Sequence, residues 1–122
     1  MMTPVRHLVF GALVLASVGC ASPQSPSERA VASELAQMSA SKRDYPGIVM
    51  GFDVRNGTTL LVSLDLQSFI GMDDDAVVAM KRHVVARWRG AWTSAHPGTH
   101  ATLQVRFIDF IGRKIAEQST SV

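Results

Sequence analysis

Residues 48–66 alternate between apolar and polar side chains on both sides of an Asn56-Gly57 turn. A period of two predicts strands that bury one face, and Asn-Gly between two such runs predicts a hairpin. A two-residue loop would set the apolar side chains of one strand opposite polar ones, whereas a three-residue loop over 56–58 makes one face wholly apolar. The pairs that this longer loop predicts are Val54–Leu60, Phe52–Val62 and Met50–Leu64.

A longer amphipathic pattern predicts a helix over 73–95. Three aspartates, 73–75, lie at its start, where the helix dipole is positive, and Pro97-Gly98 follows its end. Its apolar positions recur three and four residues apart, as on a helix that buries one stripe. They are Val77, Met80, Val84, Trp88, Ala91 and Ala95, with Trp92 beside them.

The alternation of period two returns near the C-terminus and predicts a second hairpin, closed by the loop 110–112. Its strands are predicted over 101–109 and 114–118, and the last four residues are expected to fray. The cross-strand pairs expected from this loop are Asp109–Arg113, of opposite charge, and Phe107–Ile115, which is apolar.

A first helix is predicted over 26–42. Ser25 and Glu28 have the spacing of a capping box, and Pro26 occupies the first helical position. The apolar positions that follow are Val31, Leu35 and Met38.

Together these elements predict an α+β fold, a two-layer sandwich with the order α-β-β-α-β-β, in which an antiparallel sheet of two hairpins packs on one long helix. The 122 residues, of which 47% are hydrophobic and 18% charged, fit one folded domain over 27–122. The strand order is left open, and so is whether the helix 26–42 docks on the sheet.

The first twenty residues have the organisation of an export signal. Arg6 and His7 precede an apolar run of eleven residues, 8–18, which is too short to span a bilayer. Small residues end the run before Cys20, the single cysteine of the chain. The segment Ala16-Ser17-Val18-Gly19-Cys20 resembles the lipobox of bacterial lipoproteins.

This resemblance implies that the signal 1–19 is removed by cleavage between Gly19 and Cys20. The Cys20 thiol would then carry a diacylglycerol and its amino group an acyl chain such as palmitate, which anchors the protein to a membrane. Residues 20–26 are small and polar with two prolines, as expected of a short tether. The residue after the cysteine is Ala21 rather than aspartate. In lipoproteins of this kind that residue is associated with sorting to the outer membrane, so the resemblance implies its periplasmic face rather than the inner membrane.

The chain has no recognised motif for catalysis, for a cofactor or for a metal, so we expect it not to be an enzyme. His96 and His100 flank a Pro-Gly turn without a second pair of ligands nearby, and the aspartates 73–75 lack the alternation of a calcium loop. The net charge of +2 falls to +1, or 11 basic against 10 acidic residues, when Arg6 leaves with the signal. Such a balance does not favour nucleic acid as a partner.

The candidate contact surface lies on the long helix. Trp88 and Trp92 either line a groove or, at this spacing, belong to the core. Arg82 and Arg89 belong to a basic group that either forms a solvated face or meets lipid phosphates, peptidoglycan-associated anions or an acidic partner. A hairpin, a helix with Arg87-Trp88-Arg89 and a strand follow one another here, an order similar to the C-terminal domain of TonB-type energy transducers. No residue role is carried over from that likeness.

These features predict a membrane-anchored periplasmic lipoprotein that binds an envelope protein as a non-catalytic accessory module, with sheet edges as contact surfaces. The alternative is a ligand- or inhibitor-binding lipoprotein that takes a small amphiphile, a cell-wall fragment or a foreign enzyme. A deep apolar pocket between the long helix and the sheet would favour the alternative. A filled core with a flat exposed patch would favour the first interpretation.

Overall fold

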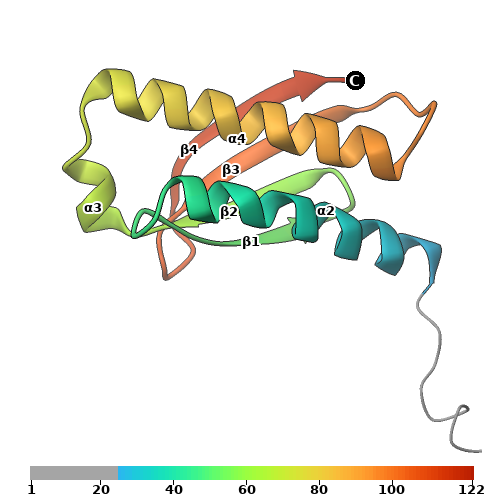
Figure 1. Ribbon diagram of the computed structural model, residues 1–122, viewed down its shortest axis with the longest axis horizontal. Coiled ribbons are helices and arrows are strands. Elements are labelled where there is room, and N and C mark those ends of the chain that lie inside the picture. The colour runs from blue at the N-terminus through green and yellow to red at the C-terminus, as the bar shows by residue number, and fades with distance from the viewer. Residues whose placement is uncertain (1–24) are drawn as a thin grey trace, which may run out of the picture.

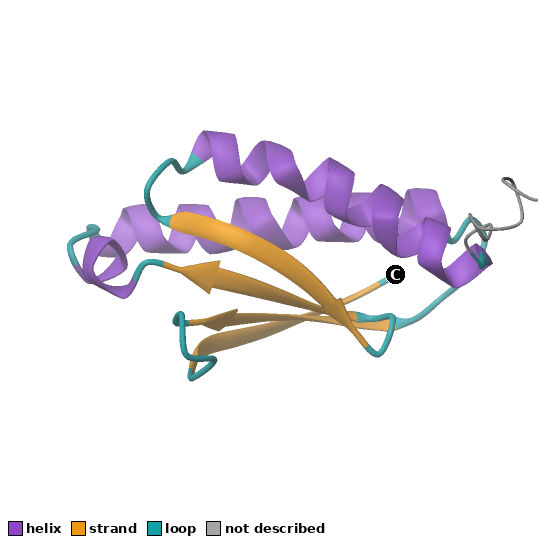
Figure 2. Ribbon diagram, turned by 90° about the horizontal axis from the view of Figure 1, so that it is seen from below, coloured by secondary structure: helices purple, strands orange, loops and turns teal. Residues whose placement is uncertain are grey.

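The computed structural model describes residues 25–122, so the predicted signal, the Gly19–Cys20 cleavage site and most of the tether lie outside the described residues. The described chain forms two layers, with both long helices on one face of a four-stranded sheet (Figure 1, Figure 2). The elements are α2 (Pro26–Asp44), β1 (Val49–Arg55), β2 (Thr59–Leu64), α3 (Leu66–Ile70), α4 (Asp74–Ala95), β3 (Thr102–Ile108) and β4 (Lys114–Ser121). None of the helices within 25–122 combines the length and the apolarity needed to cross a bilayer.

The sheet has the order β1-β2-β3-β4, and its central pair, β2 and β3, is parallel. The fold is therefore α+β as predicted, but the expectation of a wholly antiparallel sheet is wrong. The cause is the connection between the hairpins. Its helix α4 has 22 residues and spans about 33 Å, so it carries the chain back to the end of the sheet where β2 began. The next strand then runs in the same direction as β2.

The first helix docks on the domain, because α2 lies beside α4 and against β1. Two helices share the layer, so the prediction of one long helix against the sheet is incomplete. The fully buried residues of α2 are Glu34, Met38 and Ser41. The buried face of α2 therefore differs from the face predicted from Val31, Leu35 and Met38. Met38 is buried, whereas Val31 and Leu35 are only half-buried.

Local signals set where both long helices begin. The Ser25 hydroxyl accepts a hydrogen bond from the Glu28 backbone N–H at 3.2 Å, and the Ser25 N–H donates to Glu28 Oε1 at 2.9 Å, which confirms the capping box. Asp73 precedes α4 as predicted, but its carboxylate makes no capping hydrogen bond. Asp74 and Asp75 lie in the first turn, where negative charge suits the helix dipole.

The space between the two layers is filled by apolar side chains. Among those with 0% exposure, Trp88 of α4 and Phe107 of β3 are the largest. The other members of this core are Met38, Val49, Leu60, Val62, Leu64, Met80, Val84, Ala91, Trp92, Leu103 and Val105. Because these side chains come from both helices and from three strands, the described chain has one continuous core.

The first hairpin has the predicted three-residue loop. Two of the predicted pairs are confirmed, Val54–Leu60 and Phe52–Val62. The third is wrong, because a β-bulge at Met50 shifts the register and sets Val49 opposite Leu64. Val49 is therefore buried, and Met50 is 52% exposed.

The second hairpin also has its predicted loop and one of its two predicted pairs. The Asp109 N–H donates to the Arg113 carbonyl at 3.0 Å, and the two side chains form an ion pair at 2.8 Å. The Phe107–Ile115 pair is wrong: Ile115 is bulged, and Phe107 lies opposite Ala116. The last four residues do not fray, since β4 extends through most of them and continues to pair with β3.

Candidate functional site

Large apolar side chains are exposed at the end of the molecule where α3 and the β3–β4 loop lie. Ile70 of α3 is 71% exposed, and Phe110 and Ile111 of the loop are 89% and 60% exposed. Ile70 and Phe110 line one hollow of the surface together. We call these three residues the apolar tip. Periodicity could not reveal it, because it combines a loop with a five-residue helix that follows the predicted first hairpin and was not predicted.

Two aspartates hold the backbone of the apolar tip. Asp65 caps α3 by accepting hydrogen bonds from the Ser68 hydroxyl at 2.6 Å and the Ser68 N–H at 3.0 Å, and these bonds lower the pKa of Asp65. Asp109 accepts from the N–H groups of Ile111 and Arg113, at 3.1 and 2.8 Å, and from Arg113 Nε at 2.8 Å. Burial acts to raise the pKa of Asp109, but the bonds from Arg113 and Ile111 outweigh burial and lower it. The exposed side chains thus project from braced backbone.

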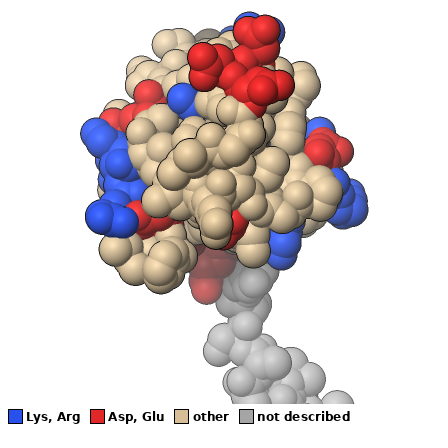
Figure 3. All heavy atoms as spheres, turned by 90° about the vertical axis from the view of Figure 1, so that its left-hand side faces the viewer, with Lys and Arg blue, Asp and Glu red and all other residues tan. Residues whose placement is uncertain are grey.

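Charged side chains surround this end of the molecule. Figure 3 looks onto it and shows a broad uncharged area, with acidic side chains gathered above and basic ones toward the sides. Asp73, Asp74 and Asp75, all exposed, belong to the start of α4, which lies at this same end (Figure 1). An apolar patch with a charged rim is the usual anatomy of a protein contact surface.

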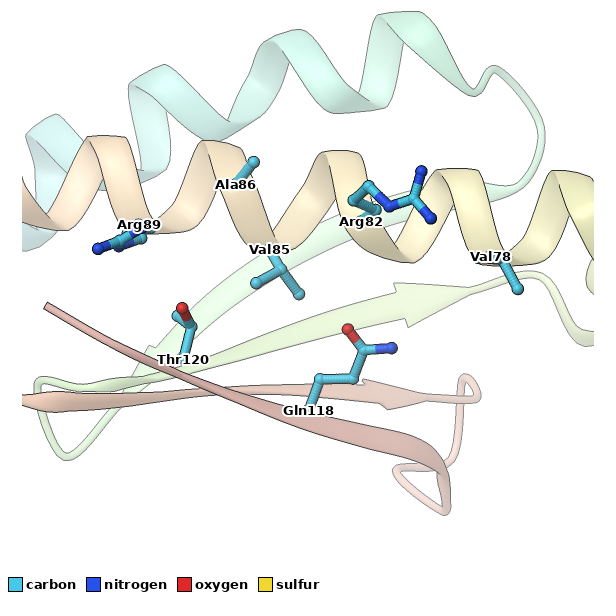
Figure 4. Close-up of a pocket in the computed structure, with 7 residues that line it drawn as sticks. All are labelled: Val78, Arg82, Val85, Ala86, Arg89, Gln118 and Thr120. Carbon is cyan, nitrogen blue, oxygen red and sulfur yellow. The ribbon is translucent and has the colours of Figure 1, made fainter.

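A second feature is a groove of about 340 Å³ between α4 and β4, here called the α4–β4 groove (Figure 4). It is lined by Val78, Arg82, Val85, Ala86 and Arg89 of α4 and by Gln118 and Thr120 of β4. Figure 4 shows Val85 pointing from the helix toward the sheet, and Gln118 and Thr120 rising from β4 toward the helix. Because β4 is an edge strand, no further strand of the described residues closes the groove on its outer side.

The arginines of the α4–β4 groove carry uncompensated charge. On another side of the same helix, Arg87 forms an ion pair with Asp44 at 3.1 Å. No ion pair within the described residues involves Arg82 or Arg89, and both side chains are exposed. The structure therefore brings these two candidate contact residues together in one groove. Two free guanidinium groups are suited to bind carboxylates.

The two tryptophans of the candidate contact surface belong to the core instead. Trp88 is 0% and Trp92 3% exposed, so neither offers surface to a partner. Trp92 Nε1 donates to the Gly57 carbonyl at 2.9 Å, which ties α4 to the β1–β2 turn. The Trp92 ring also stacks on His96, with ring centroids 4.2 Å apart. Of the four residues named from the sequence, only the arginines remain accessible.

Glu34 of α2 and His96 at the end of α4 form a contact that the sequence analysis missed. Glu34 is fully buried, and its Oε2 lies 3.3 Å from His96 Nδ1, which also lies 3.0 Å from the Trp92 carbonyl oxygen. Burial raises the pKa of Glu34 to about 6, and the charge of His96 acts to lower it. Glu34 lies one helical turn before Met38, and this spacing is the only sequence signal for its burial.

The remaining histidines of the described chain have separate polar neighbours. His83 Nδ1 lies 2.5 Å from the Tyr45 hydroxyl, and His100 Nδ1 lies 3.2 Å from the Val122 carbonyl oxygen. Thus His96 and His100, which flank one turn, have different partners. Within the part of the chain that the structure describes, no group of three or more His, Cys, Asp or Glu side chains could hold a metal ion.

The chain matches no known family model, no curated protein and no solved structure. The apolar tip can bury apolar side chains of a partner. The α4–β4 groove can bind carboxylates through two guanidinium groups. Both features are suited to binding.

Proposed function

We propose that this protein is a membrane-anchored lipoprotein on the periplasmic face of the outer membrane, whose domain binds another envelope protein as a non-catalytic accessory module. Cys20 is the anchor and residues 20–26 are the tether. The apolar tip is the observation that carries the proposal. Its three large apolar side chains are 60% to 89% exposed. Exposing apolar surface to water is unfavourable, and covering it with a partner would lower the free energy.

The filled core supports a protein partner over a small amphiphile. Trp88, Phe107 and the other core residues occupy the space between the helices and the sheet, where an apolar ligand would have to bind. The α4–β4 groove lies outside this core and is lined by two arginines and two polar side chains of β4. These features suit an extended, partly polar partner better than a buried lipid.

The position of the apolar tip relative to the tether favours a partner in the periplasm over the anchoring membrane. Cys20 and the first residue of α2, Pro26, are six positions apart, which allows at most about 20 Å. The 19 residues of α2 then run for about 28 Å toward the end of the molecule that carries α3 and the β3–β4 loop (Figure 1). An anchor at one end of α2 therefore leaves the apolar tip at the other.

Photo-cross-linking in intact cells tests this proposal. The full-length chain carries a photoreactive amino acid either at position 110, in the apolar tip, or at position 36, an exposed site on α2. We expect one envelope protein in the adducts from position 110 and not from position 36. Identical adducts from both positions, or adducts with lipid alone from position 110, would contradict a protein partner at the apolar tip.

The anchor is tested separately with Cys20→Ala. A palmitate analogue fed to the cells should label the wild-type chain and not the variant, and the variant should leave the membrane fraction. Retained label or retained membrane association in Cys20→Ala would contradict the anchor while leaving the partner experiment informative.

A further inference from the structure

Within residues 25–122, strand β4 has an unpaired edge. It is the last strand of the sheet order and has eight residues without proline. At its end, Ala101 and Val122 exchange both backbone hydrogen bonds, at 3.3 and 2.9 Å. Antiparallel neighbours alternate between pairs that exchange these bonds and pairs that do not. Along the observed register, the backbone N–H and C=O groups of Glu117, Ser119 and Ser121 therefore point toward the free edge.

The α4–β4 groove lies directly beside this edge. Gln118 and Thr120 line it from β4, and alternate residues of any strand added next to β4 would point the same way, toward α4. There they would meet Arg82, Val85 and Arg89. An added strand would thus receive backbone hydrogen bonds from the edge and side-chain contacts from the helix, which is how strand addition combines affinity with specificity.

We propose that β4 accepts an extended acidic segment of a partner protein as a fifth strand, with two carboxylates bound to Arg82 and Arg89 and an apolar side chain between them on Val85. The proposal rests on the proposed function and names the chemistry of its partner. Charge is what identifies the occupant, because neither arginine has an ion pair within the described residues.

The spacing of the two arginines predicts the spacing of the acidic residues. Arg82 and Arg89 are seven helical residues apart, about 10 Å along the helix axis. Residues four apart in a strand are separated by about 13 Å, a difference that flexible arginine side chains absorb. The residue midway between the acidic ones then lies near Val85. The recognised pattern is therefore acidic, any, apolar, any, acidic.

A second copy of this chain does not supply that pattern through its own β4. The side chains of β4 on the groove side include Gln118 and Thr120, which are uncharged. The acidic residue of this strand, Glu117, belongs to the opposite face and is paired with Arg106 at 2.8 Å. Pairing of two β4 edges would therefore leave Arg82 and Arg89 without carboxylates.

Synthetic peptides test the proposal against the full-length chain purified in detergent. The first peptide, Thr-Glu-Thr-Val-Thr-Glu-Thr, places both carboxylates and the valine on one face. A control of identical composition, Thr-Thr-Glu-Val-Glu-Thr-Thr, places the carboxylates on the face opposite the valine. Fluorescence anisotropy should show that the first peptide binds the protein at least about tenfold more tightly than the control peptide does. Equal affinities would overturn the proposal.

Matched arginine variants assign the contact to the groove. The double variant Arg82→Gln/Arg89→Gln should lower the affinity for the first peptide by at least about tenfold, because each substitution removes a charge-assisted hydrogen bond. The control Arg43→Gln changes an exposed arginine of α2 that has no ion pair in the described chain, and it should leave the affinity unchanged. Neither change removes a described ion pair, and circular dichroism checks that the fold is retained. An unchanged affinity in the double variant would overturn the proposal.

Backbone methylation of the peptide tests strand addition without altering the protein. One version is N-methylated at both threonines next to the valine, and the other at the valine alone. Alternate N–H groups of an added strand face β4, so methylation should abolish binding in only one of the two versions. Equal effects of both would overturn the strand geometry. The peptides could show no specific binding while a photoreactive residue at position 110 still cross-links a single envelope protein. In that case the inference about β4 is wrong and the proposed function stands.

Discussion

Glu34 brings a carboxyl group into the contact between α2 and α4, where its side chain is fully buried. Neither of its oxygens has a hydrogen-bond partner in the described part of the chain. His96 Nδ1, 3.3 Å from Glu34 Oε2, supplies an opposite charge only when the imidazole is protonated. Burial therefore raises the pKa of Glu34 from 4.5 to about 6, against the influence of His96. A group that ionises less readily in the folded chain than in the unfolded chain makes stability depend on pH.

The free energy of unfolding is expected to fall as the pH rises from 4.5 to about 6. In this range the folded state holds the Glu34 proton more tightly than the unfolded state does, so raising the pH favours unfolding. The fall is complete above the folded-state pKa and amounts to about 2 kcal/mol. Urea unfolding of the wild type and of Glu34→Gln across this pH range measures it. The variant should lack this fall, and a profile parallel to that of the wild type would contradict the prediction.

At the scale of single elements, both edge strands contain a β-bulge, at Met50 in β1 and at Ile115 in β4. A bulge moves the next residues to the opposite face, and edge strands are where bulges concentrate. Hydrophobic alternation could not locate them. Val49 and Met50 are both apolar, as are Ile115 and Ala116, so either member of each pair suits a core position. The choice depends on how each strand fits its neighbour.

The free edge of β4 predicts an alternating pattern of amide hydrogen exchange. The N–H groups of Gln118 and Thr120 point toward β3 and should exchange slowly, whereas those of Glu117, Ser119 and Ser121 point to the free edge and should exchange rapidly. Exchange followed by NMR at single residues measures this pattern. Uniform protection along β4 would show that something covers the edge and would contradict the prediction.

At the scale of the whole molecule, α2 is part of the same core as the sheet. Met38 is fully buried together with residues of α4 and of three strands. The described domain is therefore expected to unfold in one transition, with far-ultraviolet circular dichroism, which follows the helices, coinciding with tryptophan fluorescence, which follows Trp88 and Trp92. Two separated transitions would show that α2 is not coupled to the core.

A pair of methionine variants measures how strongly the packing of α2 on the core contributes to the free energy of unfolding. Met38→Ala should lower the free energy of unfolding by about 3 kcal/mol, because it opens a cavity among close-packed side chains. Met50→Ala, at the exposed bulge of β1, should change it by no more than about 0.5 kcal/mol. Urea unfolding of both variants gives the comparison. A similar small effect of both would contradict the docking of α2 through Met38.

For some of the candidate contact residues the sequence predicts whether the side chain is exposed, and for others it does not. Arg82 and Arg89 were predicted as surface residues of the long helix, because their positions lie off its apolar stripe, and they are exposed. The tryptophans lie at positions that suit either a core or a groove, and their burial depends on contacts with the sheet and α2. The apolar tip has no periodic signal at all, because α3 and the β3–β4 loop meet only in the folded chain.

Sequence alone determined the type of the main elements, both three-residue loops and the capping box, because periodicity, turn residues and caps act between residues close in the chain. Tertiary structure decided the parallel pairing of β2 with β3, the two bulges, the docking of α2 and the burial of Glu34. These depend on contacts between residues tens of positions apart. Their geometry is set by how whole faces pack, which no local pattern encodes.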